Sequence, residues 1–387
     1  METTKLPAKD QAPEPAPEPS FSTGILPAQD LLKAIEAKEI RAVEGIADDQ
    51  IQPASIDLRL GAKAYRVRAS FLPGSNSTVE DKLRQFSMHE MDITNGGALE
   101  RGGVYIIPLL EQVNLKHRMS GRGNPKSSTG RLDVFTRLIT DYGTEFDQVR
   151  EGYKGPLYAE VSPRTFTILV RKGSRLSQLR IRRGAPPSSD QKHKELHRDF
   201  RLVDRDLSDD DIKNGVPITV DVIGSPDTDH IIGYRARSHA GLIDVDRVGH
   251  YDVDEFWDPV RAPGKHGLVL DPADFYILAS RESVRVPSGL AAEMIAYDTL
   301  VGEFRVHYAG FFDPGFGDVS GGAKAVLEVR SYEVPFVIED GQVVGRLAYE
   351  RLTVQPERLY GLNVSSNYQR QGLRLSKHFK PPALRTR

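Results

Sequence analysis

A short polar run at residues 124–131, Asn-Pro-Lys-Ser-Ser-Thr-Gly-Arg, places hydroxyl side chains between a lysine and an arginine. Hydroxyls and backbone N–H groups in a tight turn can hold phosphate oxygens, and Lys126 and Arg131 would neutralise the phosphate charge. Ser127 and Ser128 supply the hydroxyls. The run is not a Walker loop, because the Gly-x4-Gly-Lys-Ser/Thr spacing is absent. We interpret it as a candidate phosphate-binding loop, with an ordinary surface loop as the alternative.

Two glutamates interrupt apolar strands in the same way, Glu160 in Leu-Tyr-Ala-Glu-Val and Glu328 in Val-Leu-Glu-Val. A carboxylate among buried neighbours loses hydration, which raises its pKa and suits it to general-base chemistry. The alternative is a carboxylate on the solvent face of a half-buried strand. Because the pattern occurs twice, we favour the catalytic interpretation.

Two further turns each place an acid before a glycine and an aromatic ring. Asp147 precedes Gly-Tyr153, and Asp313 precedes Pro-Gly-Phe316. Such a turn can simply cap a hairpin, or it can present a carboxylate and a ring to a sugar or a base. The basic C-terminal arm, with Tyr368 and Gln371, is either a solvated tail or a lid that folds over a bound polyphosphate.

The composition excludes several classes of chemistry. The chain has no cysteine, which removes disulfides, thiol nucleophiles and the Cys-ligated zinc of zinc-dependent deaminases. No His-Glu-x-x-His motif is present, and His89-Glu90 lacks a second histidine. We therefore expect no zinc and no metal ligands from the protein itself.

Charge and hydropathy indicate a cytoplasmic protein that binds neither nucleic acid nor membrane. The formal net charge is −2, and no apolar run approaches the roughly 20 residues that span a bilayer. The N-terminus lacks the basic-then-apolar order of a signal peptide. Basic clusters at Arg171–Lys172 and at Arg180, Arg182 and Arg183 are solvated strand faces or a local field for a polyanionic small molecule.

The elements that must position these residues are mostly short strands. Segments rich in β-branched residues and bounded by Gly, Pro, Asn and Asp predict strands at 55–60, 104–110, 135–139, 157–161, 167–170, 176–181, 218–223, 267–270, 275–279, 304–308, 325–329 and 343–349. Apolar residues at helical spacing predict one helix over 28–38. This density of strands predicts a mainly β protein of sandwich or barrel type with few short helices.

The chain divides into two β domains with three polar segments around them. We expect a disordered Pro/Ala/Glu-rich tail at 1–21 and a charged connector, with a short helix, at 185–216. The domains themselves span 22–184 and 217–365, and a mobile basic arm follows at 366–387.

An internal repeat relates the two domains. The sequence around Glu160 matches that around Glu328 at an offset of 168 residues, with equivalent glycines and apolar positions downstream. Upstream, Tyr105-Ile-Ile matches Tyr276-Ile-Leu at an offset of 171. Small changes in offset are what altered loop lengths between conserved strands would produce, so we infer a duplicated β domain.

Taken together, the motifs resemble those of the dCTP deaminase family. Residues 51–61 (IQPASIDLRLG) resemble its opening motif, and 126–131 (KSSTGR) resemble its Arg-Ser-Ser-x-Ala-Arg loop. Residues 309–317 (AGFFDPGFG) are similar to its nucleoside-binding turn, and 368–372 (YQRQG) to its C-terminal arm. Residues 326–329 (VLEV) and 155–160 (GPLYAE) both resemble the strand that carries its catalytic glutamate. The two fused halves look like the long proteobacterial form.

The resemblance implies tandem dUTPase-like β domains, distorted barrels or sandwiches, and hydrolysis of dCTP to dUTP and ammonia. It implies a Mg²⁺-bound triphosphate, a metal-free attack of water on the cytosine, and trimers, here a pseudo-hexamer of domains. It makes dTTP a candidate inhibitor, but the sequence does not decide whether dTTP inhibits this chain. Lys126, Ser128 and Arg131 would then hold the triphosphate, and Ser127 would orient the water. Backbone groups of Asp141, Tyr142 and Gly143 would read the pyrimidine.

Neither half carries the complete motif set. The first half keeps the loop but reads Gln-Val-Arg-Glu-Gly-Tyr after Asp147, whereas the second keeps the turn but has Ile-Ala-Tyr-Asp-Thr-Leu at 295–300. Two arrangements stay open, one composite site or a working first half beside a structural second half. We favour the first half with Glu160 as base, because a lost phosphate loop is harder to replace than a changed turn. A dUTPase or bifunctional enzyme, and a non-catalytic nucleotide sensor, remain as alternatives.

Overall fold

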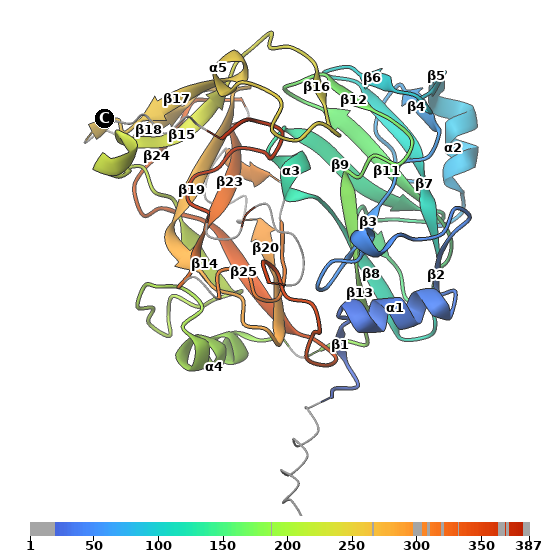
Figure 1. Cartoon of the computed structure of the whole chain (residues 1–387), viewed down its shortest axis with the longest axis horizontal. Coiled ribbons are helices and arrows are strands. Elements are labelled where there is room, and N and C mark those ends of the chain that lie inside the picture. Colours follow the sequence, from blue (N-terminus) through green and yellow to red (C-terminus); the bar gives the residue numbers. More distant parts are fainter. Residues whose placement is uncertain are drawn as a thin grey trace, which may run out of the picture.

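The structure is a computed structural model that describes residues 20–186, 188–264, 267–296, 304–307, 310–318, 321–331, 333–362, 368 and 371–381. The described part is mainly β, as predicted, with four short helices at the periphery and the short helix α3 (Ser127–Gly130) between the two halves (Figure 1). Residues 1–19 of the predicted tail lie outside the described part. Among the described helices, none is both long and apolar enough to cross a membrane.

The N-terminal half, residues 20–186, contributes to three sheets, the third of which also includes β16 (Ile243–Asp244) from the C-terminal half. Their orders are β1-β13-β8-β10 with β3 beside β13, β5-β4-β7-β11-β9 with β2 beside β7, and β16-β12-β6. The elements of this half are β1 (Gly24–Ile25), α1 (Ala28–Glu36), β2 (Ile40–Ala42), β3 (Ile56–Leu58), β4 (Lys63–Val67), α2 (Val79–Phe86), β5 (Ser87–Asp92), β6 (Gly97–Leu99), β7 (Val104–Asn114), β8 (Met119–Pro125), α3 (Ser127–Gly130), β9 (Val134–Thr140), β10 (Gln148–Val149), β11 (Lys154–Pro163), β12 (Ile168–Val170) and β13 (Ser177–Arg183).

The C-terminal half repeats this arrangement in sheets β14-β25-β20-β22, β17-β15-β19-β23-β21 and β18-β24. Its elements are α4 (Asp190–Phe200), β14 (Val216–Thr219), β15 (Ile231–Ala236), β16 (Ile243–Asp244), α5 (Val253–Phe256), β17 (Trp257–Arg261), β18 (Leu268–Leu270), β19 (Phe275–Val284), β20 (Leu290–Ala296), β21 (Phe304–His307), β22 (Phe311–Phe312), β23 (Ala323–Ser331), β24 (Phe336–Ile338) and β25 (Val343–Arg351).

The repeat inferred from the sequence recurs in the strand pairing. Strand β11 lies between β7 and β9, and β23 lies between β19 and β21 in the same way. Glu160 of β11 is paired with Ile106 of β7, and Glu328 of β23 is paired with Ile277 of β19, the equivalent strand of the other half. The pairs β8–β13 and β20–β25 are likewise equivalent. The two halves therefore share one topology, and their sheets face each other across a seam (Figure 1).

The predicted elements are present, but they are fewer than half of those observed. Each of the twelve predicted strands overlaps one of the 25 described strands, and α1 and the connector helix α4 are also found. The other strands and the short helices α3 and α5 were not predicted. Helix α2 was missed because only Val79 and Leu83 are buried in it, although Thr78 and Asp81 form the capping box that could have revealed it.

The basic arm was expected to be mobile, but the described part of it packs against the protein. Tyr368, Leu375 and Phe379 are buried, and Phe379 joins an aromatic cluster with Phe256 and Trp257. The segment 237–256 reaches from the C-terminal half to the N-terminal half and adds β16 in parallel to β12. Apolar burial thus holds the arm and both halves together.

A buried ion pair crosses the seam. Arg330 on β23 donates to Asp133, which follows α3, and to the hydroxyl of Thr165 at 2.9 Å. The Asp133 side chain is only 2% exposed, so its charge depends on partners inside the protein.

We predict that Arg330→Met lowers the free energy of unfolding by about 3 kcal/mol, because it leaves the buried carboxylate of Asp133 without its guanidinium. Urea unfolding followed by circular dichroism measures the change. Arg84→Met, which breaks an exposed pair with Glu80, is the matched control and should cost less than about 0.5 kcal/mol. Equal effects of the two substitutions would contradict this account of the seam.

Candidate active site

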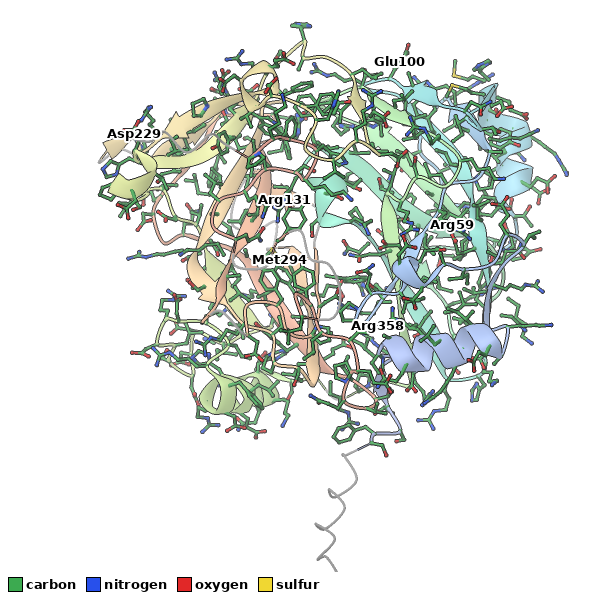
Figure 2. The ribbon with its side chains drawn as sticks, viewed as in Figure 1. Arg59, Glu100, Arg131, Asp229, Met294 and Arg358 are labelled. Carbon is green, nitrogen blue, oxygen red and sulfur yellow. The ribbon has the colours of Figure 1, made fainter. Side chains whose placement is uncertain are left out.

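A pocket opens at the seam between the halves, near Arg131 and Met294 in Figure 2. Both halves and the C-terminal arm line it. The predicted site residues that it brings together are Lys126, Ser127, Ser128, Arg131, Asp313, Phe316, Glu328, Tyr368 and Gln371. The pocket is therefore composite, in keeping with the arrangement that we favoured less.

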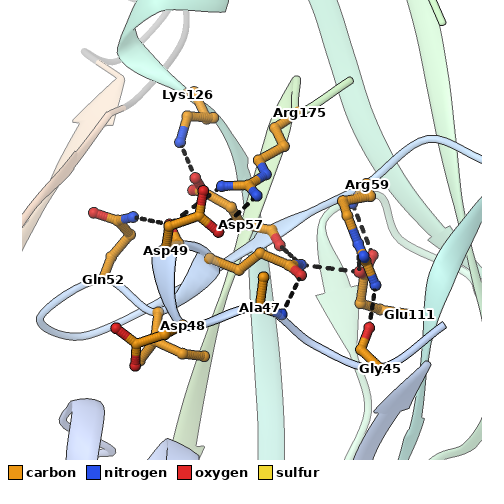
Figure 3. Close-up of polar contacts among 12 residues, drawn as sticks. Gly45, Ala47, Asp48, Asp49, Gln52, Asp57, Arg59, Glu111, Lys126 and Arg175 are labelled. Atoms are coloured by element: carbon orange, nitrogen blue, oxygen red, sulfur yellow. Dashed lines mark hydrogen bonds and ion pairs between the residues drawn. The ribbon is translucent and has the colours of Figure 1, made fainter. Parts of the chain in front are cut away.

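The phosphate-loop candidate forms one wall of this pocket. Strand β8 ends at Pro125, and the next residues turn into the single-turn helix α3. The backbone N–H of Lys126 donates to the carbonyl of Leu176 at 2.9 Å, which ties the start of the turn to the chain just before β13. The Lys126 ammonium binds the buried carboxylate of Asp57 (Figure 3). The loop is thus a fixed cationic edge and not a free surface loop.

The motif at 51–61 contacts this loop through the ion pair between Asp57 and Lys126. Asp57 lies on β3, and the adjoining Arg59 donates to Glu111 at 2.7 Å (Figure 3). Gln50 donates to the same buried Glu111 at 3.0 Å and to the backbone carbonyl of Asp57 at 2.9 Å. These bonds hold the carboxylate of Asp57 in place, so the motif acts through the position of Lys126.

Glu328 faces the loop from the other half. Along β23 the side chains alternate, so Leu327 and Val329 enter the core of the C-terminal half while Val326 and Glu328 line the pocket. The residue is 6% exposed. Burial raises the pKa of Glu328 to about 8, and the charge of Arg131 opposes that rise. A carboxyl group of this kind can exchange a proton near neutral pH.

Arg131 connects the loop, the glutamate and the arm. Its Nε lies 3.9 Å from Oε1 of Glu328. Its two terminal nitrogens donate to Oε1 of Gln371 at 3.0 Å and to the carbonyl of Arg374 at 2.9 Å. The ring of Tyr368 lies 3.9 Å from the guanidinium carbon, a cation–π contact. The arm thus closes over the cationic edge, in the place expected for a lid.

The turn that contains Asp313 and Phe316 forms the opposite end of the pocket. Gly315 has φ of +90°, a left-handed conformation that favours glycine, and it lets the chain reverse between the acid and the ring. Phe312 and Phe316 meet edge to face with centroids 5.2 Å apart. Burial raises the pKa of Asp313, and the charge of Arg180 opposes this rise. This end is therefore aromatic, with one carboxyl group.

Glu160, the expected base, lies elsewhere. It does not line the pocket, and its carboxylate accepts from Nε of Arg137 at 3.0 Å on the neighbouring strand β9. Arg137 also donates to the hydroxyl of Ser70 at 2.9 Å and lies 3.6 Å from the ring centre of Phe146. The carboxylate is thus committed to an ion pair beneath the segment around Ser70, which argues against the favoured first-half site.

The other first-half candidates also lie outside the pocket. Asp141 accepts from the backbone of Val79 at 2.8 Å at the start of α2, and Asp147 accepts from the backbone of Leu138 at 2.7 Å. These carboxylates stabilise local structure, which was the alternative interpretation of the Asp147 turn. The remaining members of this group outside the pocket are Tyr142, Gly143 and the buried Tyr153.

Sequence reasoning missed several residues that line the pocket. Gln52 and Phe311 stand inside the quoted motifs, so the motifs themselves were the available signal. Gln178 and Tyr360 lie outside any motif, and only their position in the fold reveals them. Residues 297–303, which include most of the segment where the second half lacks the loop, are outside the described part.

The pocket offers little to a metal ion. Across the described residues, no three His, Asp or Glu side chains gather as a metal site would require. At the cationic edge, the carboxylate of Asp57 is already bound to Lys126. A metal ion at this edge would therefore depend on oxygen ligands that a bound ligand brings with it.

Comparison with known proteins identifies the family. Residues 22–185 match the 2'-deoxycytidine 5'-triphosphate deaminase N-terminal domain, and residues 189–379 match the C-terminal domain of the same family. The chain belongs to the dCTP deaminase family. A crystal structure of 2'-deoxycytidine 5'-triphosphate deaminase from Agrobacterium tumefaciens is similar, with 50% identity and a TM-score of 0.81. The similarity covers 86% of this chain and 99% of that one, so the dUTPase-like fold of both halves is shown.

Curated members of the dCTP deaminase family match one half of the chain. A dUMP-forming dCTP deaminase from Corynebacterium glutamicum is 26% identical over 168 residues, which are 42% of this chain and 83% of that protein. A dCTP deaminase from Haloarcula marismortui is 29% identical over 160 residues, 40% of this chain and 78% of that protein. These relatives are about as long as one half, in keeping with a duplicated family domain.

The raised pKa of Glu328 predicts a pH-dependent stability. Because its pKa is about 8 in the folded chain and near 4.5 in the unfolded one, folding favours the protonated form. The stability that this group contributes is complete below pH 4.5 and is lost as the pH rises through 8.

We therefore expect Glu328→Gln, which cannot ionise, to gain thermal stability relative to wild type as the pH increases from 5 to 8. Differential scanning calorimetry of both proteins at these two pH values measures the difference in Tm. A difference that stays constant between the two pH values would show that Glu328 titrates normally.

Proposed function

We propose that the chain hydrolyses dCTP to dUTP and ammonia in the composite pocket, with Glu328 as the general base. The observation that carries the proposal is the position of this buried carboxylate beside Arg131, opposite the Lys126–Arg131 loop. An enzyme of the dCTP deaminase family needs a cation-lined end for the triphosphate and a proton-transfer group at the cytosine. Both stand in the same pocket.

The cationic edge fits a triphosphate. Lys126, Ser128 and Arg131 face the pocket, and Lys377 of the arm lies near enough to Lys126 for the charge of Lys126 to lower its pKa, although burial lowers that pKa more. Clustered cations that repel one another are stabilised when an anion binds between them. Mg²⁺ would arrive on the phosphates as part of the substrate and reduce their repulsion, without dedicated protein ligands.

The aromatic end fits the nucleoside. Phe312 and Phe316 present apolar surface to a flat or ring-shaped group, and Asp313 offers a hydrogen-bond partner at its edge. A deoxyribose attached to a cytosine at one side and a triphosphate at the other would extend between this end and the loop. In this placement the cytosine lies near Glu328.

The proposed reaction needs two proton transfers. Ionised Glu328 takes one proton from a water molecule while the oxygen of that water attacks C4 of cytosine. Glu328 then delivers the proton to N3. It then moves the hydroxyl proton of the tetrahedral intermediate to the amino group, which leaves as ammonia while the C4 carbonyl forms. Ser127 orients the water by hydrogen bonding, and Arg131 stabilises the ionised carboxylate.

A bifunctional, dUMP-forming activity is the second candidate, because curated relatives carry that name. It requires an activated water at a phosphate as well as at C4. The Asp147 turn that suggested such chemistry lies outside the pocket, and Asp147 binds its own hairpin. Product analysis separates the two activities, since deamination alone yields dUTP and the combined reaction yields dUMP and pyrophosphate.

The trimer that the family resemblance implies is not needed to assemble this pocket. The loop, the glutamate, the aromatic turn and the arm all come from a single chain. An oligomer would therefore add copies of a site that each chain already contains.

We predict that Glu328→Gln reduces ammonia release from dCTP by at least about a thousandfold, because the amide cannot accept the proton from water. Glu160→Gln is the matched control, since it makes the same change at the equivalent position of the other half, and should retain most of the activity. Chromatography of the nucleotide products with an ammonia assay measures both variants. The reverse result, with loss only in Glu160→Gln, would move the base to the first half.

The pH dependence of the reaction provides an independent check. Only the ionised form of Glu328 acts as base, and its pKa is about 8. We therefore expect kcat/KM for dCTP to rise with pH below 8 and to level off above it. Initial rates at low dCTP concentration, measured from pH 6 to about 9, test this expectation. A profile that is flat between pH 6 and 8 would contradict it.

A further inference from the structure

Arg180 is a buried cation that the proposed reaction does not use. It lies on β13 of the N-terminal half, and its side chain is 5% exposed. The sequence placed it in a basic cluster that was expected to be solvated or to attract a polyanion. Instead it extends into the C-terminal half, where its neighbour along the same face of the strand, Gln178, lines the pocket.

The guanidinium contacts three consecutive residues of the nucleoside end. Its carbon lies 3.9 Å from the ring centre of Phe311, and Nη2 lies 3.4 Å from both the carbonyl of Phe312 and Oδ1 of Asp313. Nη1 donates to the carbonyl of Ala292 on β20 at 3.1 Å. One planar group thus joins the turn to the strand beside it, which a planar fork of donors can do.

Arg180 does not line the pocket, so it acts on a bound nucleotide only through the turn. Its contacts fix two properties of that turn, the path of the backbone at Phe311 and Phe312 and the direction of the Asp313 carboxyl group. Without the guanidinium, Asp313 would lose its ion pair and keep only the weaker influence of Lys126, and the carbonyl of Phe312 would lose a donor.

We propose that Arg180 is a positioning residue that aims Asp313 at the sugar of the nucleotide. The inference rests on the proposed function for the identity of the ligand. The 2′-deoxyribose of dCTP has a single free hydroxyl, at C3′, because the 5′ oxygen carries the phosphates. Asp313 is the carboxyl group at the aromatic end of the pocket, so it is the partner that the 3′-hydroxyl would meet there.

The same strand offers a matched control. Arg182 lies two residues further along β13 and also crosses the seam, where it forms an ion pair with Glu350. Both arginines line a second, smaller cavity between the halves, but Arg182 pairs with Glu350 on β25 and not with the turn. Removing Arg182 therefore perturbs the seam in a similar way without disturbing Asp313.

The experiment compares calorimetric Kd values for dCTP and 2′,3′-dideoxy-CTP, which lacks the 3′-hydroxyl, with every chain also carrying Glu328→Gln so that the nucleotide is not consumed. Arg180→Met should raise the Kd of dCTP about tenfold and that of the dideoxy nucleotide less than about twofold. Arg182→Met should leave both Kd values unchanged. Arg180→Met combined with Asp313→Asn should bind dCTP no more weakly than Asp313→Asn alone, since both act through one contact.

Folding defects are distinguishable from this effect. Arg180→Lys keeps the positive charge but lacks the planar guanidinium. Even if the methionine variant does not fold, the lysine variant should weaken the binding of dCTP more than that of the dideoxy nucleotide. Equal weakening of both nucleotides in these variants, or no weakening of either, would overturn the proposal and leave Arg180 with a purely structural role.

The outcomes also separate this inference from the proposed function. A wild-type chain that releases no ammonia, yet binds dCTP with a selectivity that Arg180→Met removes, would overturn the deamination and support the positioning role. If the wild-type chain releases ammonia but Arg180→Met still binds dCTP more tightly than the dideoxy nucleotide, the deamination is supported and the positioning role is overturned. A chain that binds neither nucleotide would overturn both.

Discussion

The carboxyl group of Glu328 and the guanidinium of Arg131 face each other across the seam between two halves of one chain, 3.9 Å apart. Each is almost completely buried, so each depends on the other and on a few polar neighbours for its charge. Local structure on each side positions the two groups. Arg131 follows helix α3 in the 126–131 loop, and the alternation of side chains along β23 directs Glu328 into the pocket. The packing of the two halves then sets the distance between them.

Duplication gave the chain two equivalent glutamates with different environments. Glu328 meets an arginine from the opposite half and faces a pocket, whereas Glu160 meets Arg137 on its own neighbouring strand. Glu160 is held in an ion pair with Arg137, which also donates to Ser70, and it does not line the pocket. One copy thus contributes the 126–131 loop to the pocket and the other contributes its glutamate, so the two copies are no longer interchangeable.

The same division extends to the seam and the arm. Arg180 passes from the N-terminal half beneath the nucleoside end, while Arg330 passes in the other direction to Asp133. The arm returns from the C-terminal half and covers Arg131. Arg131, Arg180 and Arg330 therefore hold the halves in one register, and withdrawing their charges from water is favourable only where this register brings each to its partners.

The sequence by itself determined the fold class, the repeat and twelve of the 25 described strands, and it singled out the loop, the turn and both glutamates, because these depend on local patterns and motifs. It did not decide which glutamate joins the loop, because neighbours 197 residues apart, such as Arg330 and Asp133, leave no local pattern. Helix α2 was missed because it has little apolar periodicity. The arm was expected to be mobile because its composition is basic, and the sequence does not show that Phe379 packs against Trp257. Only the tertiary structure brought Arg131 to Glu328, since burial and charge pairing depend on which surfaces meet in space.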